Sequence, residues 1–350
     1  MTRLSRRELL GAAAGLAIAS CAPGGTGITP TAAASAIGAA TASPSPKPIA
    51  LKGAWVAVTS NQMIWPVAKE AGYFAKYGLD FDLSLINGSN NAIAGMLGGD
   101  VGLITAAGSA VVSAQAGGSD IVMIAGFVNK MIFRVVAGPG ITSIDQLKGK
   151  TIAVTRVGTA DYFAWQAIAA HQGWKMTDLN FIAATDAPGQ VAVLKSGNAA
   201  AIAVSPPNNI LAVQAGGHEI LDMASYNEPE QNVGIVTTRK WLTDNRPVAV
   251  AVMKASTEAI ARWKKDPAFV KSVIKTYLKN DDPEFLEVGY SAYKDIFPQA
   301  PYPSEEGMAK VIEEVTAVSP KAKDLKVAQL IDRGIVQELE TSGFIKQLYG

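Results

Sequence analysis

Small polar residues gather in a series of short turns, each of which follows an apolar run and precedes a helical pattern. The hydroxyl, amide and backbone N–H groups of such turns can hold a small molecule by hydrogen bonds, and helix N-termini beside them favour anionic groups. Taken one at a time, the same residues could simply cap helices. The binding candidates are Ser60, Asn61, Gln62, Gly88, Ser89, Ala107, Gly108 and Ser109 in the first half, and Arg156, Gly158, Thr159, Ala160, Asp161, Tyr162, Ser205 and Pro206 in the second.

Charge and stacking could add to these hydrogen bonds. Arg156 lies just before a predicted helix and could pair with a sulfonate, carboxylate or phosphate, although a solvated arginine at the rim of a site is an equal alternative. Trp65 and Tyr162 could stack on a planar ligand, and Phe127 and Trp165 are weaker candidates for that role. Aromatic residues at helical spacing also build hydrophobic cores, so both interpretations stay open.

The sequence offers little for catalysis or metal binding. Its 350 residues include one Cys and two His, and they contain neither a Gly-x-Ser-x-Gly motif nor a phosphate-binding loop. His171 is expected at the end of a helix and His218 in a turn, where histidines commonly cap or face solvent. The formal charge of +1 lacks the basic excess of a nucleic-acid binder. We therefore expect no catalytic residue, no metal, no cofactor and no nucleic-acid partner.

The elements that would position these turns alternate between strands and helices. Strands are predicted at residues 55–59, 79–86 and 101–105, with helices at 67–77, 90–97 and 109–115. The same order returns with strands at 151–155, 179–183 and 200–204 and helices at 160–171 and 189–194. This alternation predicts βαβ units and mostly parallel sheets, whose ligands lie beyond the carboxyl ends of the strands. The fold class is therefore α/β, with two similar three-layer lobes and the candidate turns between them.

The chain is too long for one ordinary hydrophobic core. We expect lobe one to comprise residues 51–136 and 238–350, and lobe two residues 137–237. The apolar runs Phe133–Ala137 and Val233–Thr237 would be the strands that cross between the lobes. The mainly helical residues 241–350 would pack on lobe one, with Ser256 as the N-cap of one helix and Asp266 opening the next.

The N-terminus has the pattern of an export signal. Residues 1–21 combine a basic start with an apolar run too short to span a membrane, and their paired Arg6 and Arg7 resemble the twin-arginine signal. The residues before Cys21 resemble a bacterial lipobox, which implies a lipidated cysteine as the mature N-terminus. Residues 22–50, rich in Ala, Gly, Ser, Thr and Pro, are predicted to be a disordered tether. These features predict an exported protein, anchored by lipidated Cys21 to the outer face of the cytoplasmic membrane.

Three segments resemble the solute-binding proteins of ABC transporters that handle sulfonates, taurine, nitrate and thiamine precursors. They are WPVAKEAGYFAKYGLD at 65–80, AGMLGGDVG at 94–102 and IDQLKGKTIAV at 144–154. The resemblance implies a type II periplasmic-binding fold in which two crossing strands join the lobes. It also implies a monomeric, non-enzymatic protein that captures a small solute in the interlobe cleft and delivers it to an ABC permease.

The resemblance leaves the solute open. The segment Ser205-Pro206-Pro207-Asn208 lacks the acid that some precursor binders carry there. This departure favours a sulfonate-like or other small anion, with a thiamine-pyrimidine-type heteroaromatic solute as the alternative. A ligand-sensing module for a membrane sensor, and an enzyme on the same fold, are further alternatives for the function.

Overall fold

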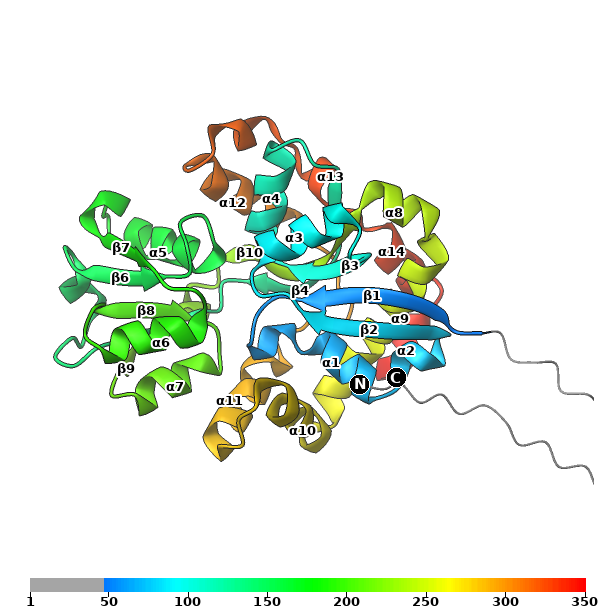
Figure 1. The fold of residues 1–350 in the computed structure, drawn as a ribbon, viewed down its shortest axis with the longest axis horizontal. Helices are drawn as coiled ribbons and strands as arrows, with labels where there is room; N and C mark the ends of the chain where they lie inside the picture. Colours follow the sequence, from blue (N-terminus) through cyan, green and yellow to red (C-terminus); the bar gives the residue numbers. More distant parts are fainter. Residues whose placement is uncertain (1–46) are drawn as a thin grey trace, which may run out of the picture. The chain divides into compact units, whose positions relative to one another are not determined.

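The computed structural model describes residues 47–350, so the export signal, Cys21 and most of the predicted tether lie outside the described residues. The described chain forms two five-stranded sheets, each flanked by helices (Figure 1). None of the helices in residues 47–350 is long and apolar enough to cross a membrane. The α/β fold class with two similar halves is confirmed.

The two sheets share one topology. The first has the order β2-β1-β3-β10-β4 and the second β7-β6-β8-β5-β9. In each sheet three neighbouring strands are parallel, and the next strand is antiparallel to them. That antiparallel strand is β10 in the first sheet and β5 in the second. The strands are β1 (Ile49–Trp55), β2 (Leu79–Leu85), β3 (Leu103–Ala106), β4 (Ile121–Lys130), β5 (Arg134–Ala137), β6 (Thr151–Val154), β7 (Asn180–Ala183), β8 (Ala201–Val204), β9 (His218–Asp222) and β10 (Pro229–Thr238).

Helices follow the parallel strands of both sheets, and a helical C-terminal region completes the first half. The helices of the two halves are α1 (Ile64–Glu70), α2 (Tyr73–Lys76), α3 (Ser89–Gly98), α4 (Gly108–Ala116), α5 (Ala160–His171), α6 (Ala187–Lys195) and α7 (Asn208–Gln214). The C-terminal helices are α8 (Arg239–Asp244), α9 (Arg246–Lys265), α10 (Pro267–Leu278), α11 (Pro283–Lys294), α12 (Glu305–Thr316), α13 (Val327–Leu330), α14 (Gly334–Thr341) and α15 (Phe344–Tyr349).

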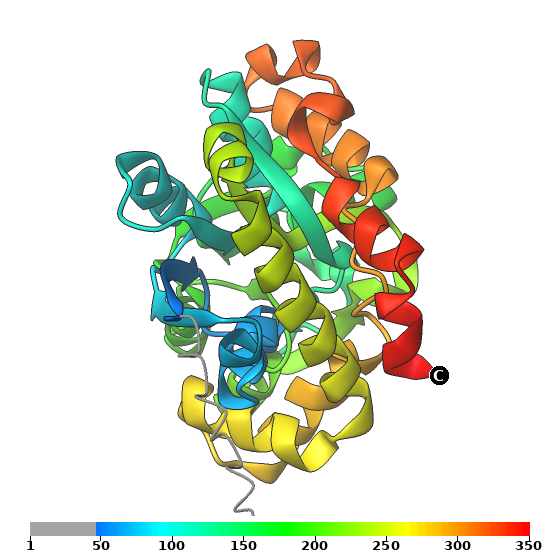
Figure 2. The same ribbon diagram turned by 90° about the vertical axis from the view of Figure 1, so that its right-hand side faces the viewer.

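The C-terminal helices pack mainly on the first half. The long helix α9 contacts α1 and α2 on one side and α14 and α15 on the other, and Figure 2 shows the red C-terminal helices alongside it. Helix α12 packs on β10 and α4, whereas α11 also reaches α7 of the second half. Asp266 opens α10 as predicted, because its side chain accepts a hydrogen bond from the Phe269 N–H.

Strand pairing shifts the boundaries that the sequence predicts between the lobes. The run Phe133–Ala137 gives β5, which pairs in the second sheet, and Val233–Thr237 belongs to β10, which pairs in the first. Neither run is shared by the two sheets. The chain instead passes between them at residues 131–133 and 223–228, outside the named strands, and the Met131 N–H donates to the Glu228 carbonyl where these segments meet.

Some local predictions are wrong for identifiable reasons. The expected helix at 67–77 is split between α1 and α2 at Gly72, whose φ of 73° lies in the left-handed region. The first strand ends at Trp55 rather than beginning there, and the apolar residues after it line the cavity between the halves instead of pairing in the sheet. Strand β4 is missing from the prediction, and His218 begins strand β9 rather than occupying a turn.

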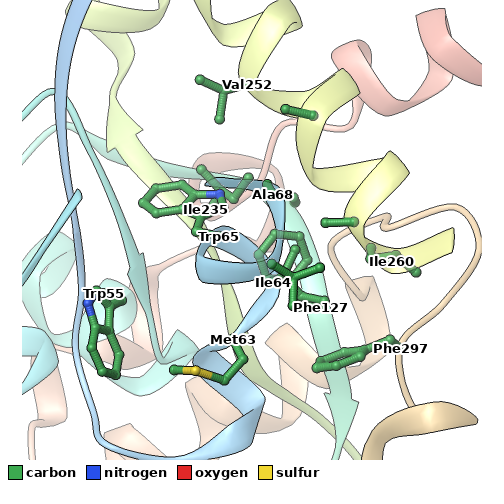
Figure 3. Close-up of a cluster of buried hydrophobic side chains, with 14 of the residues drawn as sticks. Trp55, Met63, Ile64, Trp65, Ala68, Phe127, Ile235, Val252, Ile260 and Phe297 are labelled. Atoms are coloured by element: carbon green, nitrogen blue, oxygen red, sulfur yellow. The ribbon is translucent and has the colours of Figure 1, made fainter. Parts of the chain in front are cut away.

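Ser256 is not an N-cap, because it lies in the buried middle of α9. Its hydroxyl donates to the Val252 carbonyl at 2.8 Å and accepts the indole N–H of Trp65 at 3.1 Å. Trp65 is fully buried among the apolar side chains shown in Figure 3 and packs edge-on against Phe81. This hydrogen bond satisfies the indole inside a core that joins α1 to α9.

Strand β10 is held at very close distances by its neighbours. An added Cβ at Gly234 would lie 2.0 Å from the Ala125 carbonyl oxygen of β4. At Gly108 of α4 an added Cβ would lie 2.5 Å from the Gln231 carbonyl oxygen of β10. Because both neighbours are backbone atoms, neither position accepts a side chain without moving the strand.

Two buried carboxyl groups lie where β10 packs against α12. Burial and the nearby Glu314 raise the pKa of Glu230 well above its usual range. Burial, with smaller contributions from Glu228 and Glu313, raises the pKa of Glu314 to about 7, while Lys310 opposes the shift. Because the charge of Glu314 acts on Glu230, the titrations of the two groups are linked.

The raised pKa values predict a loss of stability with increasing pH. For Glu314 the stabilising contribution is complete below its unfolded pKa and is lost as the pH rises through about 7. The expected decrease in the free energy of unfolding is about 3 kcal/mol at most. Urea denaturation between pH 5 and pH 8 should show this decrease, and Glu314→Gln should make it smaller, leaving the part that comes from Glu230. The exposed neighbour Glu313 gives the control Glu313→Gln, and an equal effect of both substitutions would contradict the assignment.

Candidate functional site

A cavity of about 170 Å³ lies between the two halves of the described chain, beyond the carboxyl ends of the parallel strands. Its walls are the turns that follow β1, β2, β3, β6, β7 and β8, together with the start of β10. It is comparable in volume to cavities of about 150 Å³ that admit benzene. The sequence candidates that line it are Asn61, Gln62, Gly88, Ser89, Ala107, Ser109, Arg156, Gly158, Thr159, Ala160, Asp161 and Ser205.

Helix N-termini face this cavity from both halves. Helices α3, α4 and α5 begin at residues of its wall, and the N-cap residues Gly88, Ala107 and Thr159 make no side-chain cap hydrogen bond. Gly88 has a φ of 88° and Gly158 a φ of 85°, a conformation that turns the chain sharply into each helix. The free N–H groups of these first turns favour an acceptor or an anionic group in the cavity.

Asp161 is a buried carboxyl group of the wall, and it is surrounded by donors. One of its oxygens accepts from the Thr159 hydroxyl, and the other accepts from the Thr155 N–H and the Gln190 amide. Burial raises the pKa of Asp161, and these hydrogen bonds oppose the shift. The carboxyl group therefore organises the turn after β6, with its oxygens already engaged inside the protein.

Arg156 lines the cavity but is exposed to solvent. The turn before α5 carries it to the rim, where it can meet an anionic group at the entrance. Both sequence-based interpretations therefore remain compatible with its position: an anion partner and a solvated arginine of the rim.

Hydrogen bonds join the two halves on both sides of the cavity. The Pro206 carbonyl accepts from the Thr59 hydroxyl at 2.9 Å and from the buried Tyr293 hydroxyl at 3.0 Å. On the other side, the exposed Asn87 amide donates to the Asp186 carboxylate at 3.1 Å. The buried contact therefore lies at the β8–α7 turn, whereas the exposed contact lies between the turns after β2 and β7.

The remaining candidates do not line the cavity. Trp65 is fully buried in the core of the first half, and Tyr162 packs against Phe163 and Phe181. Phe127 and Trp165 are also fully buried. None of these four aromatic side chains therefore stacks in the cavity, because all of them pack in the interior. Ser60 lies in the buried turn against Gly289, Gly108 lies against β10, and Pro206 supplies its carbonyl to the contact between the halves.

Other wall residues were not among the candidates. Thr155, Asp186 and Gln190 also line the cavity, from the turns after β6 and β7 and the first turn of α6. In the sequence such polar residues cannot be told from helix caps, and Asp186 does cap α6. Phe133 and Asn232 come from the segments at or beside the crossings, where no sequence signal marks a binding residue. Only the pairing of the sheets brings these residues to the cavity.

The sequence between residues 59 and 269 matches the family model described as "NMT1/THI5 like". The chain belongs to the NMT1/THI5-like family. The matched range begins after β1, contains the other parallel strands of both sheets and ends within α10. The chain is also 24% identical to the Bacillus subtilis (strain 168) protein named "Putative binding protein YtlA" over 288 residues, which are 78% of this chain and 84% of that protein.

Solved structures share the fold. The periplasmic aliphatic sulphonate binding protein SsuA from Escherichia coli superposes with a TM-score of 0.66 at 18% identity, covering 83% of this chain and 93% of that one. The periplasmic nitrate-binding protein NrtA from Synechocystis PCC 6803 gives 0.67 at 17% identity, covering 85% and 89%. The expected periplasmic-binding fold is thereby confirmed.

The exposed contact between the halves predicts an effect on their separation. Asn87→Ala removes the donor to Asp186 but leaves the cap of α6 intact, because that cap uses the other carboxylate oxygen. We expect the unliganded variant to have a larger radius of gyration in small-angle X-ray scattering. Asn180→Ala removes an exposed asparagine that bonds within the second half and serves as the control. Equal radii for both variants and the unmodified protein would contradict the prediction.

Proposed function

We propose that this protein is a solute receptor, which binds a small organic solute in the cavity between its halves and delivers it to an ABC importer. The observation that carries the proposal is one cavity walled by helix N-termini from two similar halves. Closing the halves on a solute requires a higher affinity for the closed state than for the open one. The importer's permease, facing the outer side of the membrane, would recognise the closed form.

A small anion, such as a sulfonate, is the proposed solute class. The uncapped N-termini of α3, α4 and α5 favour negative charge, and Arg156 stands at the rim. The titles of SsuA and NrtA name an aliphatic sulphonate and nitrate for those proteins. A thiamine-pyrimidine-type heteroaromatic solute is the alternative: Trp65 and Tyr162 do not line the cavity, but Phe133 of its wall is an aromatic side chain that could contact such a ring.

We further propose that the protein is an exported lipoprotein and not an enzyme. Residues 1–21 would act as a signal peptide, lipidated Cys21 would anchor the protein, and residues after it would tether lobes one and two near the membrane. The protein would work as a monomer with its permease. Co-purification with a membrane sensor instead of a permease would favour the sensory alternative, and turnover of a bound solute would favour the enzymatic one.

Scattering and mass spectrometry test solute capture together. Native mass spectrometry of the gently purified protein should reveal a bound small molecule. Adding that molecule back to the stripped protein should reduce the radius of gyration. Tight binding without any contraction would contradict closure as the mechanism, although it would leave the fold unaffected.

Arg156 tests the charge of the solute. Arg156→Ala should weaken binding of an anionic solute by a factor of several or more, because it removes the guanidinium at the rim. Calorimetric titration measures the dissociation constant. Lys195→Ala removes an exposed cation of the same half and should have no effect. An unchanged constant for Arg156→Ala would show that Arg156 is a solvated residue.

Lipid anchoring through Cys21 can be tested by labelling. A bacterial expression host fed radioactive palmitate should label the full-length protein, and the label should disappear in Cys21→Ala, because the chain has no other cysteine. The variant should leave the membrane fraction for the soluble fraction. Persistent membrane association without label would contradict lipid anchoring.

A further inference from the structure

Helix α11 belongs to the first half but also packs against the second. It contacts α7 and the turn after β1, and Figure 1 shows it beside α7. Ile210 of α7 is buried in the same hydrophobic cluster as Phe285 and Tyr290 of α11. A side chain of the second half therefore lies in the core of the first half, and separation of the two at this place would expose it to water.

The packing around α11 is close on both sides. An added Cβ at Gly289 of α11 would lie 2.8 Å from the Ser60 hydroxyl oxygen of the first half and 3.3 Å from the Pro207 Cγ of the second. Ser60 is fully buried in this contact and does not line the cavity. The glycine thus lets α11 approach residues of both halves at once.

Hydrogen bonds hold the two halves together at the same place. The Pro206 carbonyl accepts from the Tyr293 hydroxyl of α11 and from the Thr59 hydroxyl. The Asn208 amide donates to the Val58 carbonyl at 3.1 Å. Three hydrogen bonds therefore connect the β8–α7 turn of the second half to the first half.

Tyr293 can influence the cavity only through this turn. The Tyr293 side chain is fully buried and does not line the cavity. Pro206, which accepts its hydroxyl, lies between Ser205 and Asn208, and both of these residues line the cavity. Tyr293 therefore fixes part of the wall without contacting a solute.

The order of the strands places a weaker contact at the opposite side. The strands that flank the two chain crossings, β4, β5, β9 and β10, lie at one end of their sheets, whereas β2 and β7 form the other end. The turns after β2 and β7 are joined by the exposed hydrogen bond between Asn87 and Asp186. Because water competes for an exposed hydrogen bond, the halves separate more readily at the β2/β7 edge than at α11.

We infer that the contact of α11 with α7 and the turn after β1, the α11 joint, connects the halves as a third joint beside the two chain crossings, with Tyr293 as a positioning residue of the site. Through Pro206, Tyr293 holds Ser205 and Asn208 against the first half while the β2/β7 edge opens and closes. This inference rests on the proposed solute capture and defines the movement that accompanies it. Because the joint keeps part of the wall assembled, less of the site has to be ordered when a solute binds.

Distances between nitroxide labels on the solute-free, full-length protein test the α11 joint. Pulsed electron double resonance measures them on cysteines introduced in a Cys21→Ala background, which removes the native cysteine. The pair Val213→Cys and Ser291→Cys spans the joint, and the pair Leu85→Cys and Ala183→Cys spans the β2/β7 edge, all at exposed positions. We expect a narrow distance distribution across the joint and one about twice as wide across the edge. Equal widths, or a wider distribution across the joint, would overturn the inference.

Gly289→Ala should loosen the joint without altering the cavity. The added methyl group would press on Ser60 and Pro207, so the distribution across the joint should widen. Gly95→Ala is the matched control, because it adds the same methyl group to a helix of the first half no closer than 3.7 Å to its neighbours. The control should leave the distribution as it is in the parent.

Tyr293→Phe tests the hydrogen bond without introducing a clash. It removes one of the two hydroxyl donors to the Pro206 carbonyl, so the distribution across the joint should widen less than in Gly289→Ala. An unchanged distribution in both variants, with circular dichroism matching the parent, would overturn the joint. If Gly289→Ala does not fold, Tyr293→Phe decides alone.

These measurements need no solute, so their outcome is separate from that of solute capture. Failure to recover or bind any solute, with no contraction in scattering, would contradict the proposed function itself. The label distances decide only whether the halves stay joined at α11.

Discussion

The first N–H groups of a helix have no acceptor within the helix, and this requirement organises the site. Helices α3, α4 and α5 begin at one cavity without a side-chain cap, so their N–H groups need another partner. Helix α6 differs, because Asp186 accepts the Gly189 N–H and also bonds to Asn87 of the first half. The N-termini of α3, α4 and α5 are thus available to a guest, as is that of α7, which begins at Asn208 of the wall without a side-chain cap. The N-terminus of α6 instead takes part in holding the halves together.

The contacts between the halves are unequal. At the Pro206 carbonyl, the Tyr293 hydroxyl is fully buried, and breaking its bond without a replacement would leave a polar group unsatisfied. The Asn87–Asp186 bond is exposed, so water competes with it, and breaking it costs less than breaking the buried contact. Separation of the halves is therefore easier on the side of Asn87, and the β8–α7 turn is the more persistent contact.

Much of the fold could be predicted from the sequence because strand and helix signals repeat in order along both halves. Helix α5 begins and ends at the predicted residues 160 and 171, since Gly158 and Gly173 delimit its apolar pattern. Ser256 could not be placed from sequence, because a serine satisfied inside a core looks the same as a capping serine. The sequence also could not show to which sheet β5 and β10 belong, since this depends on pairing between strands that are distant in the chain.

The site was predictable to the extent that it lies in turns after parallel strands. Polar wall residues such as Gln62 and Asp161 came from that rule. The rule could not separate Trp65, which faces the core, from residues that face the cavity, because both lie on the same short segment. Gln190 was not among the candidates. Its place in the wall depends on hydrogen bonds from its amide to Asp161 and Thr155, which only the folded chain brings beside it.

The glycine contacts of β10 bear on how the molecule can move. Because Gly234 lies against the β4 backbone and Gly108 of α4 lies against the backbone of β10, the strand is closely packed against both neighbours. Asn232 and Val233 of this strand also border the cavity. Any swing of one half must then be taken up by backbone rotations at residues 131–133 and 223–228. Residues Asn232 and Val233 of the first sheet would then keep their place beside the solute while the second half moves. Contact of the solute with β10 would precede that movement.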